Sequence, residues 1–137
     1  MTRALAAALA AFGHLAAATD AAAATLVIRV EGVRSDQGII YAGVCATGFG
    51  DEDCPYRSRE AAAAGTVELR IQNVEPGDYA VAVFQDLNGN GRIDRPLFIP
   101  TEPYGFSNGV GRGGPPRFEA AKVSVREPTT TVVVYLR

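Results

Sequence analysis

The stretch Thr66–Phe84, with the sequence TVELRIQNVEPGDYAVAVF, decides the fold class. Residues 66–72 alternate apolar and polar side chains, which is typical of a strand with one face buried and the other in water. Residues 73–78 are rich in turn-forming types. Residues 79–84 are apolar on both faces, as in a central strand covered on both sides. The stretch therefore predicts two consecutive strands joined by a turn.

Outward from this stretch, further strands are expected at 25–31, 39–46, 118–125 and 130–136. The alanine-rich segment 56–64 is the exception, because its composition predicts a short helix that ends at Gly65. This pattern, which contains no internal repeat, predicts an all-β fold. We expect an antiparallel Greek-key β-sandwich of the immunoglobulin type, with about seven strands and one long functional loop, in a single domain at 24–137.

Tyr79 lies directly after the turn and allows two interpretations. In a tyrosine corner its hydroxyl would bond back to a neighbouring backbone group. A tyrosine that is simply buried in the core would give the same sequence pattern.

The N-terminus predicts an export signal, because a charged start is followed by an apolar run and then by small residues. We expect a signal peptide at 1–23, cleaved between Ala18 and Ala24. An alanine-rich helix retained on the mature protein is the alternative. Gly13 and His14 interrupt a run that is already too short to cross a bilayer, so no membrane span is expected. The mature protein is therefore predicted to be periplasmic or secreted.

The two cysteines, Cys45 and Cys54, enclose a short polar segment. In an oxidising compartment two nearby thiols pair readily, so the sequence predicts a disulfide between them. A metal or redox pair is the alternative. The spacing is too long for a CxxC redox motif, and the mature chain would lack a histidine to complete a zinc site.

The long segment 85–116 is dense in Gly, Asn, Asp and Pro, and it contains DLNGNGRID at 86–94. This segment places oxygen-bearing side chains at relative positions 1, 3, 5 and 9, with glycine at position 6, which is the spacing of a calcium-binding loop. Calcium binds several hard oxygen ligands in a tolerant geometry. The expected calcium ligands are Asp86, Asn88, Asn90, Arg92 through its carbonyl, Asp94 and, as an added carboxylate, Glu102, with Asp78 as a further possibility.

The loop is not an EF-hand, because Leu97 stands where an EF-hand has its bidentate Glu and the flanking segments do not look helical. The alternative is a metal-free Asn-Gly turn, in which the Asp and Asn side chains bond their own backbone. The sequence leaves both interpretations open.

Tyr104, Phe106 and Asn108 follow this loop and are expected either to contact a partner or to pack, with Phe106 closing the end of the sandwich core. The glycine-rich segment 110–114 does not indicate a phosphate site, because no strand-to-helix context follows it.

The segments GDYAVAVF (77–84), DLNGNGRID (86–94) and PTEPYGFSN (100–108) together resemble the bacterial family called domain of unknown function 2141. The resemblance implies an exported, single-domain β-sandwich similar to transthyretin-like and carboxypeptidase-regulatory-like domains, without an established activity. Family members often have His where this chain has Gln85 and Gly where it has Phe98. The departure at Phe98 affects the path of the chain after the loop, and so whether Glu102 lies close enough to act as an ion ligand.

Charge and residue types exclude several functions. The formal net charge is −2 and the arginines are scattered, so no nucleic-acid partner is expected. The single histidine, His14, lies in the expected signal peptide, so no serine of the mature chain has an imidazole partner. An Asp86–Glu102 carboxylate pair could do acid–base chemistry, but a calcium site explains the same residues. The protein is therefore not expected to be an enzyme.

The sequence thus predicts a non-enzymatic exported module with a calcium-ordered loop that binds an unknown protein or another component of the cell envelope. The alternative is a small-ligand carrier with a pocket beside the 86–108 loop. A carrier requires a concave apolar pocket, whereas a scaffold requires a flat patch or an exposed strand edge.

Overall fold

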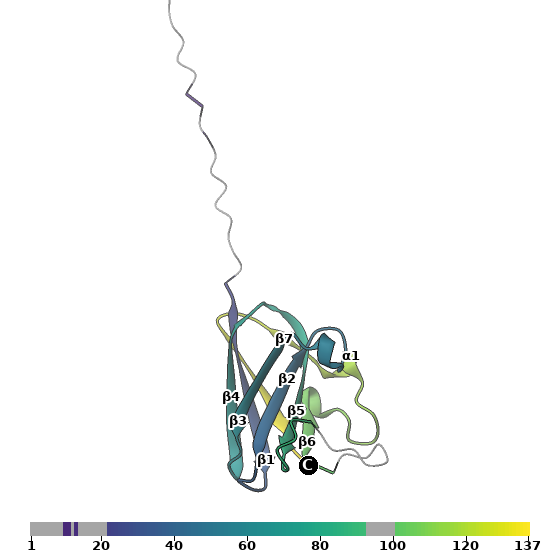
Figure 1. The fold of residues 1–137 in the computed structure, drawn as a ribbon. Helices are drawn as coiled ribbons and strands as arrows, with labels where there is room; N and C mark the ends of the chain where they lie inside the picture. Colours follow the sequence, from purple (N-terminus) through teal and green to yellow (C-terminus); the bar gives the residue numbers. More distant parts are fainter. Residues whose placement is uncertain (1–9, 12, 14–21, 93–100) are drawn as a thin grey trace, which may run out of the picture.

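The computed structural model describes residues 10, 11, 13, 22–92 and 101–137. Over these residues the chain forms two packed β-sheets with short helical turns at the connections (Figure 1). The predicted all-β sandwich is confirmed. None of the described helices is long and apolar enough to cross a membrane.

The three-stranded sheet has the order β4-β1-β8 and is built around β1 (Ala24–Val33). Strand β4 (Gly65–Val74) pairs with β1 in the antiparallel sense, and β8 (Thr129–Tyr135) pairs with its other edge in parallel. The parallel pair differs from the expected purely antiparallel arrangement. It arises because the first and last strands of the domain run in the same direction and lie side by side.

The second sheet has the order β3-β2-β5-β6. Strand β5 (Gly77–Asp86) pairs along one edge with β2 (Ile39–Cys45). Its other edge pairs with two short strands in succession, β7 (Lys122–Val125) and β6 (Tyr104–Phe106). Strand β3 (Tyr56–Ala61) forms the far edge beside β2.

The helix predicted at 56–64 is wrong, because Tyr56–Ala61 is strand β3. The segment pairs with β2 residue by residue, and its charged side chains lie exposed along the sheet edge. Tyr56 packs against the core at the start of the strand. Helix propensity is a weak preference, and here pairing with a neighbouring strand overrides it.

Within the described residues, three single-turn helices interrupt the strands. They are η1 (Asp51–Asp53), η3 (Ser107–Gly109) and α1 (Phe118–Ala121). The strand expected at 118–125 is therefore a helical turn followed by the four-residue strand β7.

The core lies between the two sheets and follows the alternation that the sequence predicts. Val67, Leu69 and Ile71 of β4 are buried and face the core, whereas Glu68 and Arg70 are exposed. Strand β5 likewise directs Val81 and Val83 inward. Burial of these aliphatic side chains is the main force that holds the sheets together.

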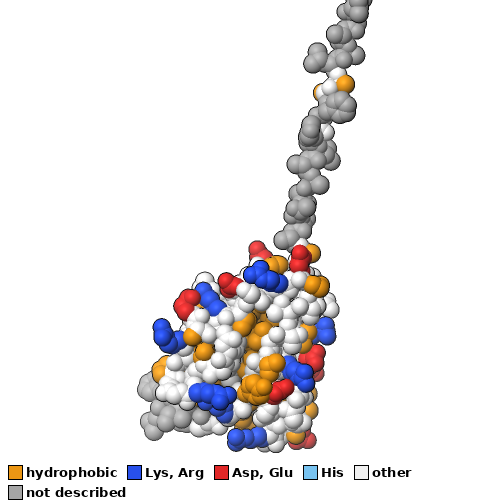
Figure 2. All heavy atoms as spheres, turned by 180° about the vertical axis from the view of Figure 1, so that it is seen from behind, with side chains coloured by type: hydrophobic (Ala, Val, Ile, Leu, Met, Phe, Trp, Pro, Cys, Tyr) orange, Lys and Arg blue, Asp and Glu red, His pale blue; other side chains and the backbone are white. Residues whose placement is uncertain are grey.

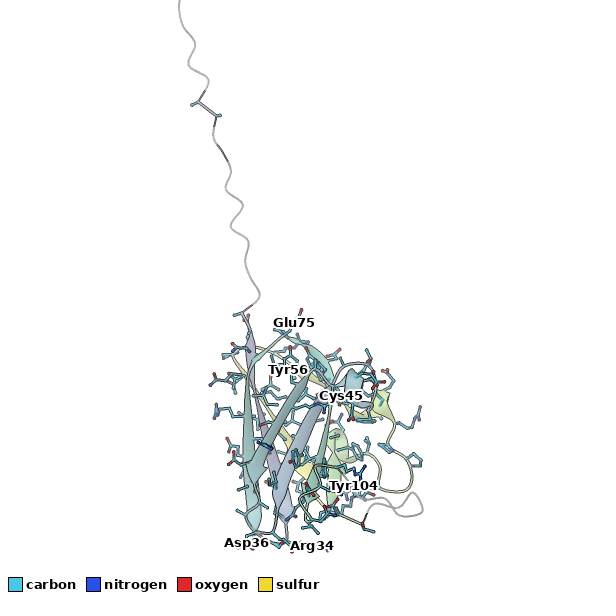
Figure 3. The ribbon with its side chains drawn as sticks, viewed as in Figure 1. Arg34, Asp36, Cys45, Tyr56, Glu75 and Tyr104 are labelled. Atoms are coloured by element: carbon cyan, nitrogen blue, oxygen red, sulfur yellow. A yellow bond between two sulfur atoms is a disulfide. The ribbon has the colours of Figure 1, made fainter. Side chains whose placement is uncertain are left out.

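Tyr79 forms a tyrosine corner at one end of the sandwich. Its hydroxyl donates a hydrogen bond to the carbonyl oxygen of Glu75 at 2.6 Å. The amide of Glu75 in turn donates to the hydroxyl of Tyr56 at 2.9 Å, and both Tyr56 and Glu75 lie at this end in Figure 3. Burial, and next the hydrogen bond with Tyr56, raise the pKa of Tyr79 to about 12.

The opposite end of the sandwich is closed by β6. The backbones of Tyr104 and Arg137 exchange two hydrogen bonds, each of 3.2 Å, which link β6 to the residues that follow β8. At Gly105 a Cβ atom would lie 2.2 Å from the carbonyl oxygen of Tyr135, so only glycine permits this close approach of the two sheets.

Candidate functional site

Asp86 ends β5 and organises the loop that follows. Its side chain is fully buried, at 0% exposure. One carboxylate oxygen accepts hydrogen bonds from the amides of Gly89 at 2.9 Å and Asn90 at 3.3 Å, and the other accepts from Gly91 at 2.7 Å. Gly89 and Gly91 have φ angles of 74° and 75°, which glycine adopts at little cost.

The two asparagines of the loop also accept hydrogen bonds from its backbone. The side-chain oxygen of Asn88 accepts from the amide of Asn90 at 3.2 Å, and that of Asn90 accepts from the amide of Arg92 at 3.0 Å. These are the bonds expected of a metal-free turn. They do not test the calcium interpretation. A carboxylate offers about four lone-pair sites, and Asp86 uses three of them to accept the amides of Gly89, Asn90 and Gly91. Asp94 lies outside the described residues.

Glu102 returns to the base of this loop. It is 5% exposed, and its Oε2 accepts a hydrogen bond from the amide of Leu87 at 2.7 Å. Two buried carboxylates, those of Asp86 and Glu102, thus contact the same short stretch of chain. Asp78 lies at the other end of β5, where it accepts a bond from the hydroxyl of Ser124 at 2.8 Å. Among the described residues, no three His, Cys, Asp or Glu side chains gather as a metal-binding group.

Gln85, which precedes Asp86, ties β5 to the β1–β2 turn. It is 1% exposed, and its Nε2 donates to the carbonyl oxygens of Gln37 at 2.8 Å and Ser35 at 3.2 Å. Its Oε1 is buried without a hydrogen-bond partner. The sequence singled out this residue only as a departure from the family pattern.

The aromatic residues after the loop pack on the outer face of the five-stranded sheet. Phe106 pairs with Ala82 in the sheet register and contacts Phe49, with ring centroids 5.1 Å apart. Tyr104 contacts Phe106 at 5.9 Å. The backbone of β6 closes one end of the sandwich, but the side chain of Phe106 lies on the outer face and is not part of the core. The partner-binding role expected of these residues stays a prediction.

Ser107 and Asn108 hold the start of β7. The buried hydroxyl of Ser107 accepts a bond from the amide of Val81 at 2.9 Å and donates to the carbonyl of Ala121. Asn108 donates its side-chain amide to the carbonyls of Ala120 at 3.1 Å and Lys122 at 3.0 Å. These bonds give the Ser-Asn pair a structural role.

The predicted disulfide is confirmed, since the sulfur atoms of Cys45 and Cys54 are 2.03 Å apart. The enclosed loop is also held from within by Asp53. Its carboxylate accepts hydrogen bonds from the hydroxyl of Thr47 at 2.8 Å and the amide of Gly50 at 3.1 Å. The disulfide and these bonds together fix the loop that carries Phe49 above the sheet.

A groove of about 570 Å³ lies on the outer face of the five-stranded sheet. We call it the outer groove. Its floor is the cross-strand pair Gly43 and Ala82, whose side chains are too small to fill the space. One wall is formed by the neighbouring pair Tyr41 and Phe84, whose rings stack at 5.3 Å with 14° between their planes. Phe49 and the disulfide also line the groove.

Charged side chains also line the outer groove. Arg57 and Arg59 lie on β3, in register with Gly43 and Tyr41, and Arg92 belongs to the Asp86 loop. Arg57 is paired with Asp51, at 3.8 Å between charged atoms. In the described part of the chain, Arg59 and Arg92 have no ion pair.

Sequence reasoning offered a pocket beside the 86–108 loop as its alternative, but it did not identify the residues that line this groove. Each lining residue looks unremarkable in its own strand, and the pattern exists only when β3, β2 and β5 are aligned. The small residues Gly43 and Ala82, each two positions from an aromatic residue in its strand, were the one signal available.

A second hollow, of about 610 Å³, follows the exposed edge of β8. Val133 and Tyr135 line it and are 38% and 52% exposed. Figure 2, which views the molecule from behind, shows hydrophobic side chains gathered in a band along the middle of this side. Strand β8 pairs only with β1 among the described strands.

A family model described as "Uncharacterized protein conserved in bacteria (DUF2141)" matches residues 28–133. The match covers more than half of the chain, so the protein belongs to this family, and the predicted membership is confirmed. No curated protein and no solved structure matches the chain.

Proposed function

We propose that this protein is a non-enzymatic binding module held outside the cytoplasm, in the periplasm or as a secreted component of the cell envelope, which carries a small ligand in the outer groove. The observation that carries the proposal is the groove itself. Its volume of about 570 Å³ is typical of small-molecule sites, and aromatic rings line it. This concave shape favours the carrier over a scaffold with a flat binding face.

The chemistry of the chain supports binding without catalysis. The single histidine of the sequence, His14, precedes the folded domain. The hydroxyl of Ser107 is hydrogen-bonded to the backbone, and the hydroxyl of Ser124 donates to Asp78. The described groove lining supplies rings and guanidinium groups together with the hydroxyl of Ser58 and the carboxylate of Asp51. Asp51 is paired with Arg57, and none of the described lining residues is a histidine that could activate the hydroxyl.

Export is supported by the disulfide, which is typical of oxidising compartments. The start of β1 is consistent with removal of residues 1–23. Ala24 is 0% exposed, and the next amide, that of Thr25, bonds to the carbonyl of Pro128 at 2.9 Å. Cleavage is therefore expected before Ala24, since later cleavage would remove part of the core.

The binding role can be tested with N-phenyl-1-naphthylamine, an uncharged fluorescent probe that brightens in apolar sites. We expect the purified mature protein to bind it saturably. Ala82→Leu should abolish binding, because the larger side chain fills the groove floor. Val133→Ser, on the other sheet, should leave binding unchanged. Absence of binding to the folded wild-type protein, or equal binding to Ala82→Leu, would contradict the carrier.

A second proposal concerns the Asp86 loop, which we propose binds calcium. It is supported by the two buried carboxylates, Asp86 and Glu102, at the base of a loop with calcium-loop spacing. Burying carboxylate charge is costly unless it is compensated, and a cation would add to the compensation given by the backbone amides.

The test is the melting temperature in EDTA, in calcium and in magnesium. An ion present at about 100 times its dissociation constant stabilises the fold by about 2.7 kcal/mol, or roughly 10 °C for a domain of this size. Asp94→Ala should abolish the calcium-specific rise, whereas Asp78→Ala, a carboxylate at the other end of β5, should preserve it. Equal melting temperatures with and without calcium would reject the ion site and leave the carrier proposal unaffected.

A further inference from the structure

The charges around the outer groove restrict the ligands that it can hold. We propose that the groove selects small molecules that combine a flat apolar group with an anionic group, such as an aromatic carboxylate or sulfonate. This inference rests on the carrier function proposed above and adds to it the chemical class of the ligand.

The aromatic walls of the outer groove favour a ligand with a flat apolar group. Tyr41 and Phe84 stack nearly parallel and together line one wall of the groove. Phe49 contributes a further ring, held in place by edge contact with Phe118 at 5.4 Å. The floor of Gly43 and Ala82 adds no branching side chain. A planar apolar group gains the largest contact area in such a space, with favourable ring–ring geometry.

The guanidinium groups that line the outer groove favour a ligand with an anionic group. Three arginines and one aspartate line the groove, and the aspartate, Asp51, is already paired with Arg57. This leaves Arg59 and Arg92 as uncompensated positive charges among the described lining residues. A guanidinium group binds carboxylate or sulfonate oxygens through paired N–H donors, with both Coulombic and geometric selectivity.

The positions of the two arginines fit a ligand that spans the groove. Arg59 pairs directly with Tyr41, which in turn pairs with Phe84, so the cation lies at the end of the ring wall. Arg92 comes from the loop that Asp86 fastens through its three backbone hydrogen bonds. The sheet and the loop thus each supply one cation to the rim of the apolar space.

The test compares two probes of similar aromatic size. 8-Anilinonaphthalene-1-sulfonate carries an anionic group, and N-phenyl-1-naphthylamine is uncharged. We expect the sulfonate to bind the wild-type protein more tightly, with an affinity that falls as salt rises. Arg59→Gln and Arg92→Gln should each weaken sulfonate binding by about tenfold or more, the effect of losing one charged hydrogen bond, and leave the uncharged probe unaffected.

The controls separate charge, shape and folding. Arg70→Gln removes an exposed arginine from β4 on the other sheet and should change neither affinity. Ala82→Leu should abolish binding of both probes. If this variant does not fold, Gly43→Ala replaces it, since the added Cβ would be 3.7 Å or more from its neighbours and should narrow the floor without a clash. Urea unfolding checks that each variant retains its fold.

The outcomes distinguish the two proposals. If both probes bind with equal affinity and the Arg59→Gln/Arg92→Gln double variant leaves sulfonate binding intact, the anionic preference is wrong and the carrier function survives. If sulfonate binding persists when the groove floor is filled, the probe binds elsewhere and the ligand-class proposal is wrong. If neither probe binds the folded wild-type protein, both proposals fail.

Discussion

Tyr79 shows how one side chain fastens two parts of the fold. Its hydroxyl bonds to the Glu75 carbonyl, four residues earlier in the chain, while its ring packs edge-on against Tyr56 at 5.8 Å. The sequence left a tyrosine corner and a simply buried residue as alternatives. The structure shows both features together, so the residue links the β4–β5 turn to β3 and to the core.

The raised pKa of Tyr79 makes alkaline stability a measure of this corner. Its folded-state pKa of about 12 lies above the ordinary 10.0, so the neutral hydroxyl contributes stability that is fully present below pH 10. That stability is lost as the pH rises toward 12. We expect Tyr79→Phe to lower the free energy of unfolding at pH 7 by about 1 kcal/mol, through the lost hydrogen bond. Its stability should then fall less steeply between pH 10 and 12.

Chemical unfolding followed by circular dichroism across this pH range measures both effects. Tyr135→Phe, which changes a tyrosine that is 52% exposed, is the matched control and should keep the wild-type pH dependence. Identical alkaline slopes for wild type and Tyr79→Phe would contradict the link between this hydroxyl and stability.

At the scale of elements, strands with regular alternation of apolar and polar residues could be predicted. Segments without that alternation, such as β3, could not. The pattern of residues 66–72 alone specifies which face of β4 is buried, because a strand has a period of two. Residues 56–64 carry no such pattern, and their alanines favoured a helix. The pairing with β2 that makes β3 a strand involves residues far away in the chain, which local composition does not report.

The disulfide loop offers a test at this scale. The Cys45→Ser/Cys54→Ser double variant should be less stable by about 2–3 kcal/mol, since the bond restricts the unfolded chain. Urea unfolding of wild type and variant measures the difference, and reductant should lower the wild-type stability by a similar amount. The variant should still fold, because Asp53 and Phe49 hold the loop independently. Equal stability of the two proteins would show that the bond contributes nothing to the fold.

At the scale of the whole molecule, the candidate site depends on how the sheets are assembled. The sequence located the Asp86 loop and the cysteine pair, because both are encoded by residues close together in the chain. The outer groove needs the register of three strands, and the return of Glu102 needs the path of the chain after the loop. Neither the groove nor the position of Glu102 can be inferred from one segment of the sequence alone.

The closure of the two sheets at Gly105 can be tested by adding one methyl group. Gly105→Ala would place a Cβ atom 2.2 Å from the carbonyl oxygen of Tyr135, so the strands must separate. We expect a loss of about 1–3 kcal/mol, as for other overpacked sites, measured by urea unfolding. Gly43→Ala adds the same methyl group to the same sheet with its nearest neighbour at 3.7 Å and should be close to neutral. Equal losses in both variants would contradict the importance of the close approach.

The position of β1 between β4 and β8 has a consequence for the order in which the molecule is made. The first strand of the domain needs one neighbour from the middle of the chain and another from its last strand. While the ribosome is still working, β1 has no second neighbour, and its core-facing residues Leu26, Ile28 and Val30 have only part of their cover. The three-stranded sheet can therefore be completed only after β8 has been synthesised.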